Sequence, residues 1–186
     1  MKSNAGIIIK TTVILTLICA VAAAALGVTN YFTEDAIKEQ EEKSAAEAMS
    51  RVIAADSYEE KTVTFEGAEY VYNVARSGGN TEGYIFTVSE NGYGGAVKVM
   101  IGIKDGKTEA VEVLDASTET PGLGQKSTDP GFRDGFKGKS GGLTAAKDPK
   151  SETEIKALTG ATITSKAVTA AVNKAYEIYE TVKGAE

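Results

Sequence analysis

Four hydroxyl side chains surround a Gly-Ala pair in the stretch LTGATITS, which covers residues 158–165. Apolar residues recur after this stretch at spacings of three and four, which predicts an amphipathic helix. Because Ser and Thr are preferred at helix N-caps, we expect Thr164 or Ser165 to cap this helix, with Thr162 one turn upstream. The predicted buried face of the helix consists of Val168, Ala171, Val172, Ala175, Ile178, Tyr179 and Val182.

A helix that begins here favours an anion beside Thr162. The N-terminus of a helix carries unpaired N–H groups and the positive end of the helix dipole, and both attract a phosphate group. Gly160 lets the backbone approach such a ligand closely. From spacing alone, an ordinary capped helix with a glycine in its lead-in fits the same residues.

A second stretch that suits ligand binding is ETPGLG, at residues 119–124. Pro121 fixes one φ angle and the two glycines widen the choice of backbone angles, so we expect a tight loop whose backbone can approach a flat ligand. A plain surface turn has the same composition, and this loop by itself does not separate the two.

The composition excludes several kinds of chemistry. The 186 residues include no His and one Cys, so the chain's own side chains cannot build a zinc site, an iron–sulfur cluster or a His-ligated haem. A Ser-His-Asp or Cys-His nucleophile is excluded as well, and we expect no catalytic residue and no metal site. Any redox chemistry therefore requires a bound organic cofactor. The formal net charge of −6 argues against nucleic acid as a partner.

Residues 11–28 run without a charged side chain, which predicts a single transmembrane helix. Two lysines precede this span and two acidic residues follow it, so the positive-inside tendency places the N-terminus in the cytoplasm and the remainder outside the cell membrane. A signal-peptidase site within the alanines at residues 22–25 is the alternative, and cleavage there would release the protein.

Residues 34–54 show apolar residues at helical spacing and predict a helix that leaves the membrane. After residue 54 the apolar residues recur at every second position, which is typical of strands. Turn signals at residues 91–95 and at Asp105-Gly106 separate these stretches, and the pattern predicts an antiparallel meander. We expect a short helix at residues 129–136 and a loop at residues 138–150. The predicted fold class is therefore α+β, with one N-terminal transmembrane helix and an antiparallel or mixed sheet flanked by helices. The predicted strands cover residues 62–65, 70–74, 84–88, 96–103 and 108–114.

Together these stretches resemble a known family. TGAT at residues 159–162, followed by ITS, resembles the (S/T)GAT motif of FMN-binding domains in the G subunit of Rnf complexes and in the C subunit of sodium-pumping NADH:quinone reductases. ETPGLG stands verbatim as in that family, upstream of the motif. GYGG at residues 92–95 and the later Asp105-Gly106 occur in the family's order. The resemblance covers most of residues 60–183 and the N-terminal span.

The resemblance implies FMN bound covalently through a phosphoester to the Thr162 hydroxyl, attached by a flavin transferase. It also implies an electron carrier in an Rnf complex, which couples electron flow between ferredoxin and NAD to Na⁺ or H⁺ movement. The expected partners are the other membrane subunits of that complex, and the chain is not catalytic alone. The residues implied to bind the cofactor are Thr159, Gly160, Ala161, Thr162, Ile163 and Thr164, together with Glu119, Thr120, Gly122 and Leu123.

The sequence departs from the family pattern at Lys156, where many members have Asp, and at Ser117, where many have His. We expect a cytoplasmic tip and transmembrane helix in residues 1–29, a membrane-proximal helix in residues 30–58 and an FMN-binding domain in residues 59–186. Three alternatives stay open: a part of a Na⁺-translocating quinone reductase that is similar to its C subunit, a stand-alone extracytoplasmic flavoprotein, and a non-redox envelope or assembly protein.

Overall fold

The computed structural model describes residues 5–184, apart from the side chains of residues 5, 35, 36, 38 and 41. By its internal contacts the chain divides into two units, Met1–Lys43 and Ser44–Glu186. The second unit contains the sheet and all of the predicted cofactor-binding residues.

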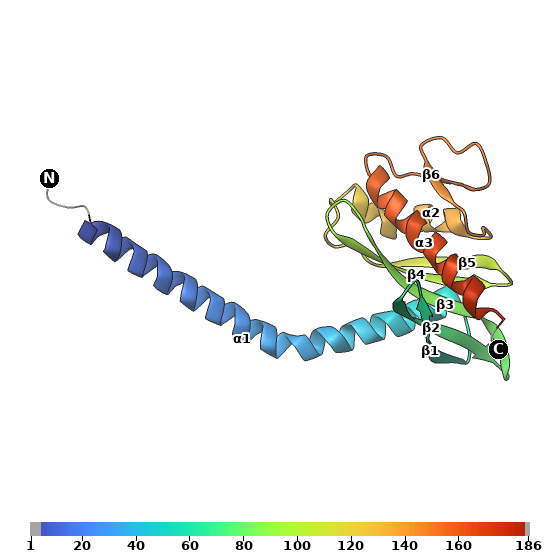
Figure 1. The fold of residues 1–186 in the computed structure, drawn as a ribbon, viewed down its shortest axis with the longest axis horizontal. Coiled ribbons are helices and arrows are strands. Elements are labelled where there is room, and N and C mark those ends of the chain that lie inside the picture. Colours follow the sequence, from blue (N-terminus) through green and yellow to red (C-terminus); the bar gives the residue numbers. More distant parts are fainter. Residues whose placement is uncertain (1–4, 185–186) are drawn as a thin grey trace. The chain divides into compact units, whose positions relative to one another are not determined.

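The first unit is helical. Helix α1 spans Ala5–Val52 (Figure 1). Its segment Gly6–Glu34 contains an 18-residue window with a mean hydropathy of 2.3, and by length and composition it could cross a membrane. The predicted span at residues 11–28 lies inside this segment. The helices predicted at residues 11–28 and 34–54 are continuous, because residues 29–33 between them contain neither Pro nor Gly to end the first one.

The centre of the second unit is a five-stranded sheet (Figure 1), in which the strands follow chain order and every neighbouring pair is antiparallel. This arrangement confirms the predicted meander. Asp105 and Gly106 join the last two strands with φ angles of 52° and 72°, as a type I′ hairpin turn requires. The strands are β1 (Ser57–Phe65), β2 (Ala68–Ser77), β3 (Asn80–Asn91), β4 (Ala96–Lys104) and β5 (Lys107–Asp115).

Helix α3 (Thr162–Val182) packs on one face of the sheet, mainly against β3 and β4 (Figure 1). Its predicted apolar face is the face that packs on the sheet, and Tyr179 is the one member of that face that is only partly buried. The Tyr179 ring makes edge contacts with the rings of Tyr84 and Phe86, with centroids 5.5 and 6.5 Å apart. Helix and sheet thereby share the larger of the two apolar cores.

The opposite face of the sheet is covered by the last turns of α1. Val52 and Ile53 are buried there, in a smaller core with residues of β2, β3 and β4. A glycine permits this approach, because a Cβ at Gly102 would lie 2.8 Å from the Val52 carbonyl oxygen and 2.9 Å from Ile53 Cγ1. The buried members of this core are Ala48, Val52, Ile53, Ala75, Ile85 and Met100.

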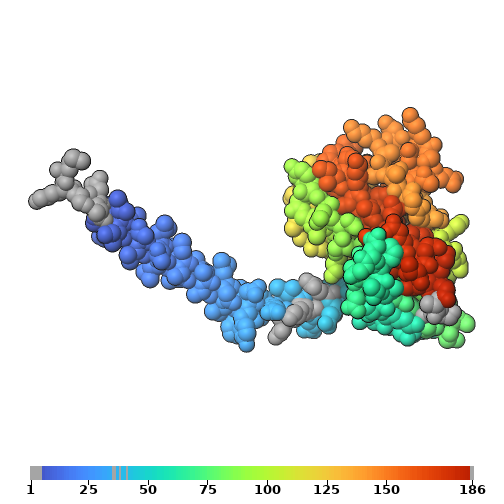
Figure 2. Space-filling model, viewed as in Figure 1, coloured from blue at the N-terminus to red at the C-terminus, as the bar shows by residue number. Residues whose placement is uncertain are grey.

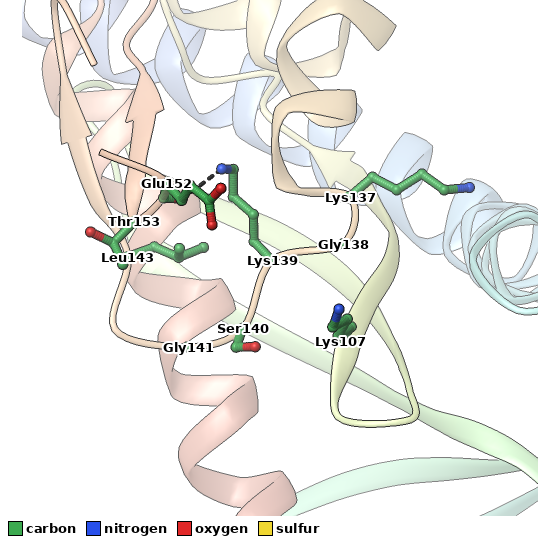
Figure 3. A pocket seen from close by; sticks show the side chains of 9 residues that line it. All are labelled: Lys107, Lys137, Gly138, Lys139, Ser140, Gly141, Leu143, Glu152 and Thr153. Atoms are coloured by element: carbon green, nitrogen blue, oxygen red, sulfur yellow. Dashed lines mark hydrogen bonds between the residues drawn. The ribbon is translucent and has the colours of Figure 1, made fainter. Parts of the chain in front are cut away.

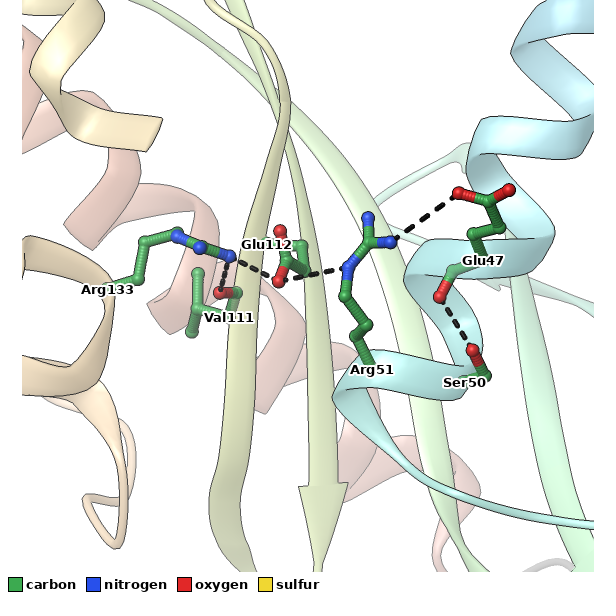
Figure 4. Close-up of polar contacts among 6 residues, drawn as sticks. All are labelled: Glu47, Ser50, Arg51, Val111, Glu112 and Arg133. Atoms are coloured by element: carbon green, nitrogen blue, oxygen red, sulfur yellow. Dashed lines mark hydrogen bonds and ion pairs between the residues drawn. The ribbon is translucent and has the colours of Figure 1, made fainter. Parts of the chain in front are cut away.

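An ion-pair network fastens two helices to the edge strand β5 (Figure 4). Glu112 of β5 pairs with Arg51 of α1 at 3.4 Å and with Arg133 of helix α2 (Pro130–Arg133). Arg51 also pairs with Glu47, one turn earlier, at 3.8 Å. The side chains of Glu112 and Arg133 are each 17% exposed, so salt screens this pair less than the exposed pair of Arg51 with Glu47.

Short elements connect β5 to α3. They include η1 (Gly124–Thr128), α2 and η2 (Asp134–Phe136). Together α2 and η2 confirm the short helix predicted at residues 129–136, and the rings of Phe132 and Phe136 are buried. The predicted loop at residues 138–150 is wrong in one respect, since it contains β6 (Thr144–Ala146), which pairs in parallel with β7 (Glu154–Lys156). Strands of three residues are too short to show a periodicity. In Figure 2 this segment, in orange, forms the surface beside the red helix α3.

We expect Gly102→Ala to destabilise the fold, because its Cβ has no room against the Val52 carbonyl group. Overpacking of this kind costs about 1–3 kcal/mol. Thermal unfolding of the full chain in detergent would record the loss as a lower Tm. Gly135→Ala is the matched control, since nothing lies within 4 Å of its Cβ. Equal Tm values for the two variants would contradict the packing of α1 on this strand.

Candidate functional site

A pocket of about 580 Å³ lies at the N-terminal end of α3, where segments far apart in the sequence meet. Its volume falls within the range of about 300–1,000 Å³ that is typical of small-molecule and cofactor sites. The turn between β3 and β4, the loop at residues 119–124 and the first turn of α3 all contribute to it. The lining residues are Tyr93, Glu119, Thr120, Leu123, Gly124, Lys147, Gly160, Ala161, Thr162, Ile163 and Thr164.

The structure brings most of the predicted site residues together in this pocket, with two exceptions. Thr159 is exposed and lies outside the lining. Gly122 also lies outside it, and its φ angle of 75° shows that its part is to let the loop turn.

The start of α3 differs from the prediction. The helix begins at Thr162 with Ala161 at its N-cap, so the expected cap at Thr164 or Ser165 is wrong. Both hydroxyls have other partners: Thr164 Oγ1 donates to Glu119 Oε2 at 2.5 Å, and Ser165 Oγ donates to the Ala161 carbonyl oxygen at 2.9 Å. Thr162 therefore belongs to the first turn itself, among the N–H groups that have no acceptor within the helix.

The loop at residues 119–124 is tight, as predicted. The N–H groups of Leu123 and Gln125 both donate to the Thr120 carbonyl oxygen, at 3.1 and 3.3 Å. The Leu123 side chain is 41% exposed and lies against Gly160, whose added Cβ would be 3.1 Å from Leu123 Cδ2. The loop and the stretch before α3 are thus in direct contact.

Sequence reasoning missed three lining residues. Tyr93 is 71% exposed, and its position between glycines in GYGG was a usable signal, because such a turn holds an aromatic ring away from the sheet. Lys147 is the only basic lining residue in the part of the chain that the structure describes. The lysine-rich composition of residues 137–150 indicated positive charge but not which lysine would reach the pocket. Gly124 carries no signal beyond its membership of the ETPGLG loop.

The neighbouring lysines serve a different part of the surface. A pocket of about 480 Å³ is lined by Lys107, Lys137 and Lys139 (Figure 3). Lys139 Nζ donates to the Glu152 carbonyl oxygen at 2.6 Å, and Lys137 points away and pairs with Glu109 at 3.1 Å. These two lysines are engaged within the protein, and neither lines the pocket that contains Thr162.

Known proteins match most of the chain. Residues 92–177 match the FMN-binding domain family, and residues 1–52 match the RnfG N-terminal region. The chain is 38% identical to the G subunit of the Na(+)-translocating ferredoxin:NAD(+) oxidoreductase complex of Acetobacterium woodii, over 94% of this chain and 92% of the relative. It is 33% identical to the G subunit of the proton-translocating ferredoxin:NAD(+) oxidoreductase complex of Clostridium ljungdahlii, over 91% and 90%. The chain belongs to the RnfG family.

The fold of this RnfG chain is also similar to solved structures. The C subunit of the Na(+)-translocating NADH-quinone reductase from Parabacteroides distasonis aligns with a TM-score of 0.51 and 25% identity, over 60% of this chain and 61% of that one. The chain therefore spans about three fifths of that structure's length. NqrC of Shewanella oneidensis aligns with a TM-score of 0.55 and 17% identity, over 67% and 68%, which is a likeness of fold alone.

The segment that leads into the loop at residues 119–124 is held by Asp115. The Ser117 backbone N–H donates to Asp115 Oδ1 at 2.8 Å, and this bond holds the pKa of the Asp115 carboxyl below its ordinary value of 3.8. The backbone and the side chain of Ser117 both stabilise the ionised form of Asp115.

This contact predicts a pH dependence of stability. Because the folded pKa lies below the unfolded value of 3.8, the contact stabilises the fold fully above that pH, and its contribution is lost as pH falls through the folded pKa. Asp115→Asn keeps an acceptor but cannot titrate, so below about pH 4 the unfolding free energy should fall more steeply for the wild type. Denaturant unfolding of the full chain in detergent, repeated at several pH values, measures how the unfolding free energy of each protein changes with pH. Equal pH dependence in the wild type and in Asp115→Asn would refute the contribution of the Asp115 carboxyl group.

Proposed function

We propose that this RnfG chain carries FMN, attached through a phosphoester to the Thr162 hydroxyl, as an electron carrier in an ion-translocating ferredoxin:NAD oxidoreductase complex of the membrane. The observation that carries the proposal is the position of Thr162, in the first turn of α3 and on the lining of the pocket. The redox role is supported by relatives that are named as the G subunit of ferredoxin:NAD(+) oxidoreductase complexes.

The residues present suit FMN at both of its ends. At the phosphate end, the free N–H groups and dipole of α3 favour an anion, and Lys147 adds a positive charge to the lining. At the ring end, Tyr93, Leu123 and Ile163 are exposed and offer apolar and aromatic surface to a flat ring system.

Thr162 serves as an attachment point. Its hydroxyl oxygen would form the new P–O bond by displacing a nucleoside monophosphate from a flavin dinucleotide, and the hydroxyl proton leaves with the displaced phosphate. The net addition to the chain is FMN less one water. No His occurs in the sequence to act as the base, so we assign activation of the hydroxyl to an external flavin transferase.

Bound FMN would supply one- or two-electron transfer, which the chain's own side chains do not provide. The chain's task is to bind and orient the cofactor: Thr162 fixes its phosphate end, and the loop at residues 119–124 limits where its ring can lie. A covalent bond also prevents loss of the cofactor outside the cell, where free FMN is scarce.

We place the FMN-binding domain on the extracytoplasmic side of the cell membrane. The segment Gly6–Glu34 would span the bilayer with its N-terminus in the cytoplasm, because lysines precede it and acidic residues follow it. The proposed partners are the other membrane subunits of the complex and the flavin transferase that loads Thr162.

The alternatives differ in what they predict. A protein with a role like that of NqrC would carry the same cofactor, and so would a stand-alone flavoprotein. The two RnfG relatives reported above, however, align over 92% and 90% of their own length, and residues 1–52 match the RnfG N-terminal region. A non-redox envelope protein would carry no flavin at all.

The test is the intact mass of the full chain, expressed in a host that exports it together with a flavin transferase. We expect the wild type to be heavier by FMN less one water and to show flavin absorbance. Thr162→Ala should have the bare polypeptide mass, and Thr162→Ser should load, because it keeps a hydroxyl. Thr64→Ala, which removes an exposed hydroxyl on β1, is the matched control and should load fully, because Thr64 lies outside both the pocket lining and the TGAT stretch.

Two outcomes would overturn the proposal. A loaded Thr162→Ala variant would move the attachment to another residue. A bare mass for the wild type, while a known substrate of the same transferase is labelled, would reject the flavin carrier and favour the envelope protein.

A further inference from the structure

Glu119 is a buried acidic side chain at the base of the pocket. It is 1% exposed and, among the residues that the structure describes, it is the only charged side chain in the buried core. Burying a carboxyl group is costly unless its oxygens accept hydrogen bonds. Its hydrogen-bond partners therefore indicate what this residue does.

Both oxygens of Glu119 accept hydrogen bonds from segments that are distant in sequence. Oε1 accepts from the Gly94 backbone N–H at 2.9 Å, and Oε2 accepts from Thr164 Oγ1 at 2.5 Å. Gly94 belongs to the turn between β3 and β4, and Thr164 belongs to the first turn of α3. We call this pair of hydrogen bonds the Glu119 tie.

Three glycines let the backbone close around the Glu119 tie. An added Cβ at Gly92 would lie 2.3 Å from Glu119 Oε1, and one at Gly124 would lie 2.5 Å from Oε2 and 2.8 Å from Thr164 Oγ1. An added Cβ at Gly94 would lie 1.9 Å from the Thr118 carbonyl oxygen. Any side chain at these positions would push the turn, the loop or the helix away from the carboxyl group.

The Glu119 tie joins two elements that line the same pocket, the β3–β4 turn and the first turn of α3. Tyr93 lies between Gly92 and Gly94, so its backbone is fixed where the tie holds the turn. On the other side, Thr162 is two residues before Thr164 in α3. The tie thus sets the separation between an exposed aromatic ring and the proposed attachment point.

We propose that Glu119 is a positioning residue, whose two hydrogen bonds hold the Tyr93 turn against the first turn of α3 so that a flavin ring linked to Thr162 stacks against Tyr93. This inference rests on the proposed function, because it needs flavin at Thr162. Both Glu119 oxygens already have protein partners, so the residue acts through Tyr93 and α3.

The first measurement does not involve flavin. In the full chain carrying Thr162→Ala, amide hydrogen exchange is compared with and without Glu119→Ala. We expect exchange within residues 92–95 and 165–168 to rise about tenfold, as expected for the loss of a hydrogen bond, with β1 and β2 unchanged. The amides of residues 165–168 donate to the carbonyl oxygens of residues 161–164, so they report on the first turn of α3. Glu119→Gln should stay within about twofold, since its amide can accept from Gly94 N–H and donate to Thr164 Oγ1.

The second measurement uses the loaded full chain and the fluorescence of its flavin, which a stacked tyrosine ring quenches. We expect Tyr93→Leu to raise the fluorescence several-fold, and Glu119→Ala to raise it to a similar level although Tyr93 is still present. Glu119→Gln should leave it near the wild-type value. Glu60→Ala, which removes an exposed acidic side chain on β1, is the control and should change neither readout.

A pair of glycine variants tests the tie without altering Glu119. Gly124→Ala should reproduce both effects of Glu119→Ala, because its Cβ would displace the Glu119–Thr164 contact. Gly131→Ala should have no effect, because nothing lies within 4 Å of its Cβ. If Glu119→Ala fails to fold, these two variants still test whether the Glu119 tie positions Tyr93.

The outcomes separate this inference from the proposed function. Unchanged exchange in both Glu119→Ala and Gly124→Ala, or faster exchange across the whole sheet, would overturn the positioning role. The same follows if Glu119→Gln behaves like Glu119→Ala, which would indicate a role for charge, or if exchange rises while fluorescence does not. A wild type without flavin rejects the proposed function and the ring contact together, and exchange then still reports on the tie.

Discussion

The burial of one face of α3 against the sheet is the interaction on which the rest of the second unit depends. Side chains along the whole helix, from Val168 to Val182, are removed from water there. Burying a Val or Ile side chain contributes about 1.5–3 kcal/mol, so this contact fixes the position of the helix on β3 and β4. Once the helix is fixed, its first turn must lie beside the β3–β4 turn, and the pocket forms between them.

Polar contacts then define the pocket within that apolar frame. The carboxyl group of Glu119 is nearly inaccessible to water and depends on donors from the turn and from α3. Its neighbours Gly92, Gly94 and Gly124 leave no room for side chains. The apolar contact supplies most of the stability, whereas the hydrogen bonds determine how the lining segments are spaced.

Much of the fold was predictable from the sequence, because the signals are local. Period-two strands, the Asp105-Gly106 turn and the apolar face of the last helix all depend on neighbouring residues, and the structure contains all of them. The strands are longer than predicted, since β1 starts at Ser57 instead of residue 62 and β3 spans Asn80–Asn91 instead of residues 84–88. The paired strands β6 and β7 were not predicted, because three residues carry no period. The helix start was misplaced because the hydroxyls of Thr164 and Ser165, good caps by type, are engaged with Glu119 and the Ala161 carbonyl group.

The sequence by itself determined the class of this protein: an apolar N-terminal segment, an α+β domain, no His and a single Cys, and the stretches that resemble the RnfG family. Only the tertiary structure decided which residues share the pocket. Tyr93, Lys147 and Gly124 enter it and Thr159 does not, although Thr159 belongs to the motif. The physical reason is that a pocket is made by contacts between distant segments, and these depend on how α3 packs on the sheet and on which donors Glu119 accepts from.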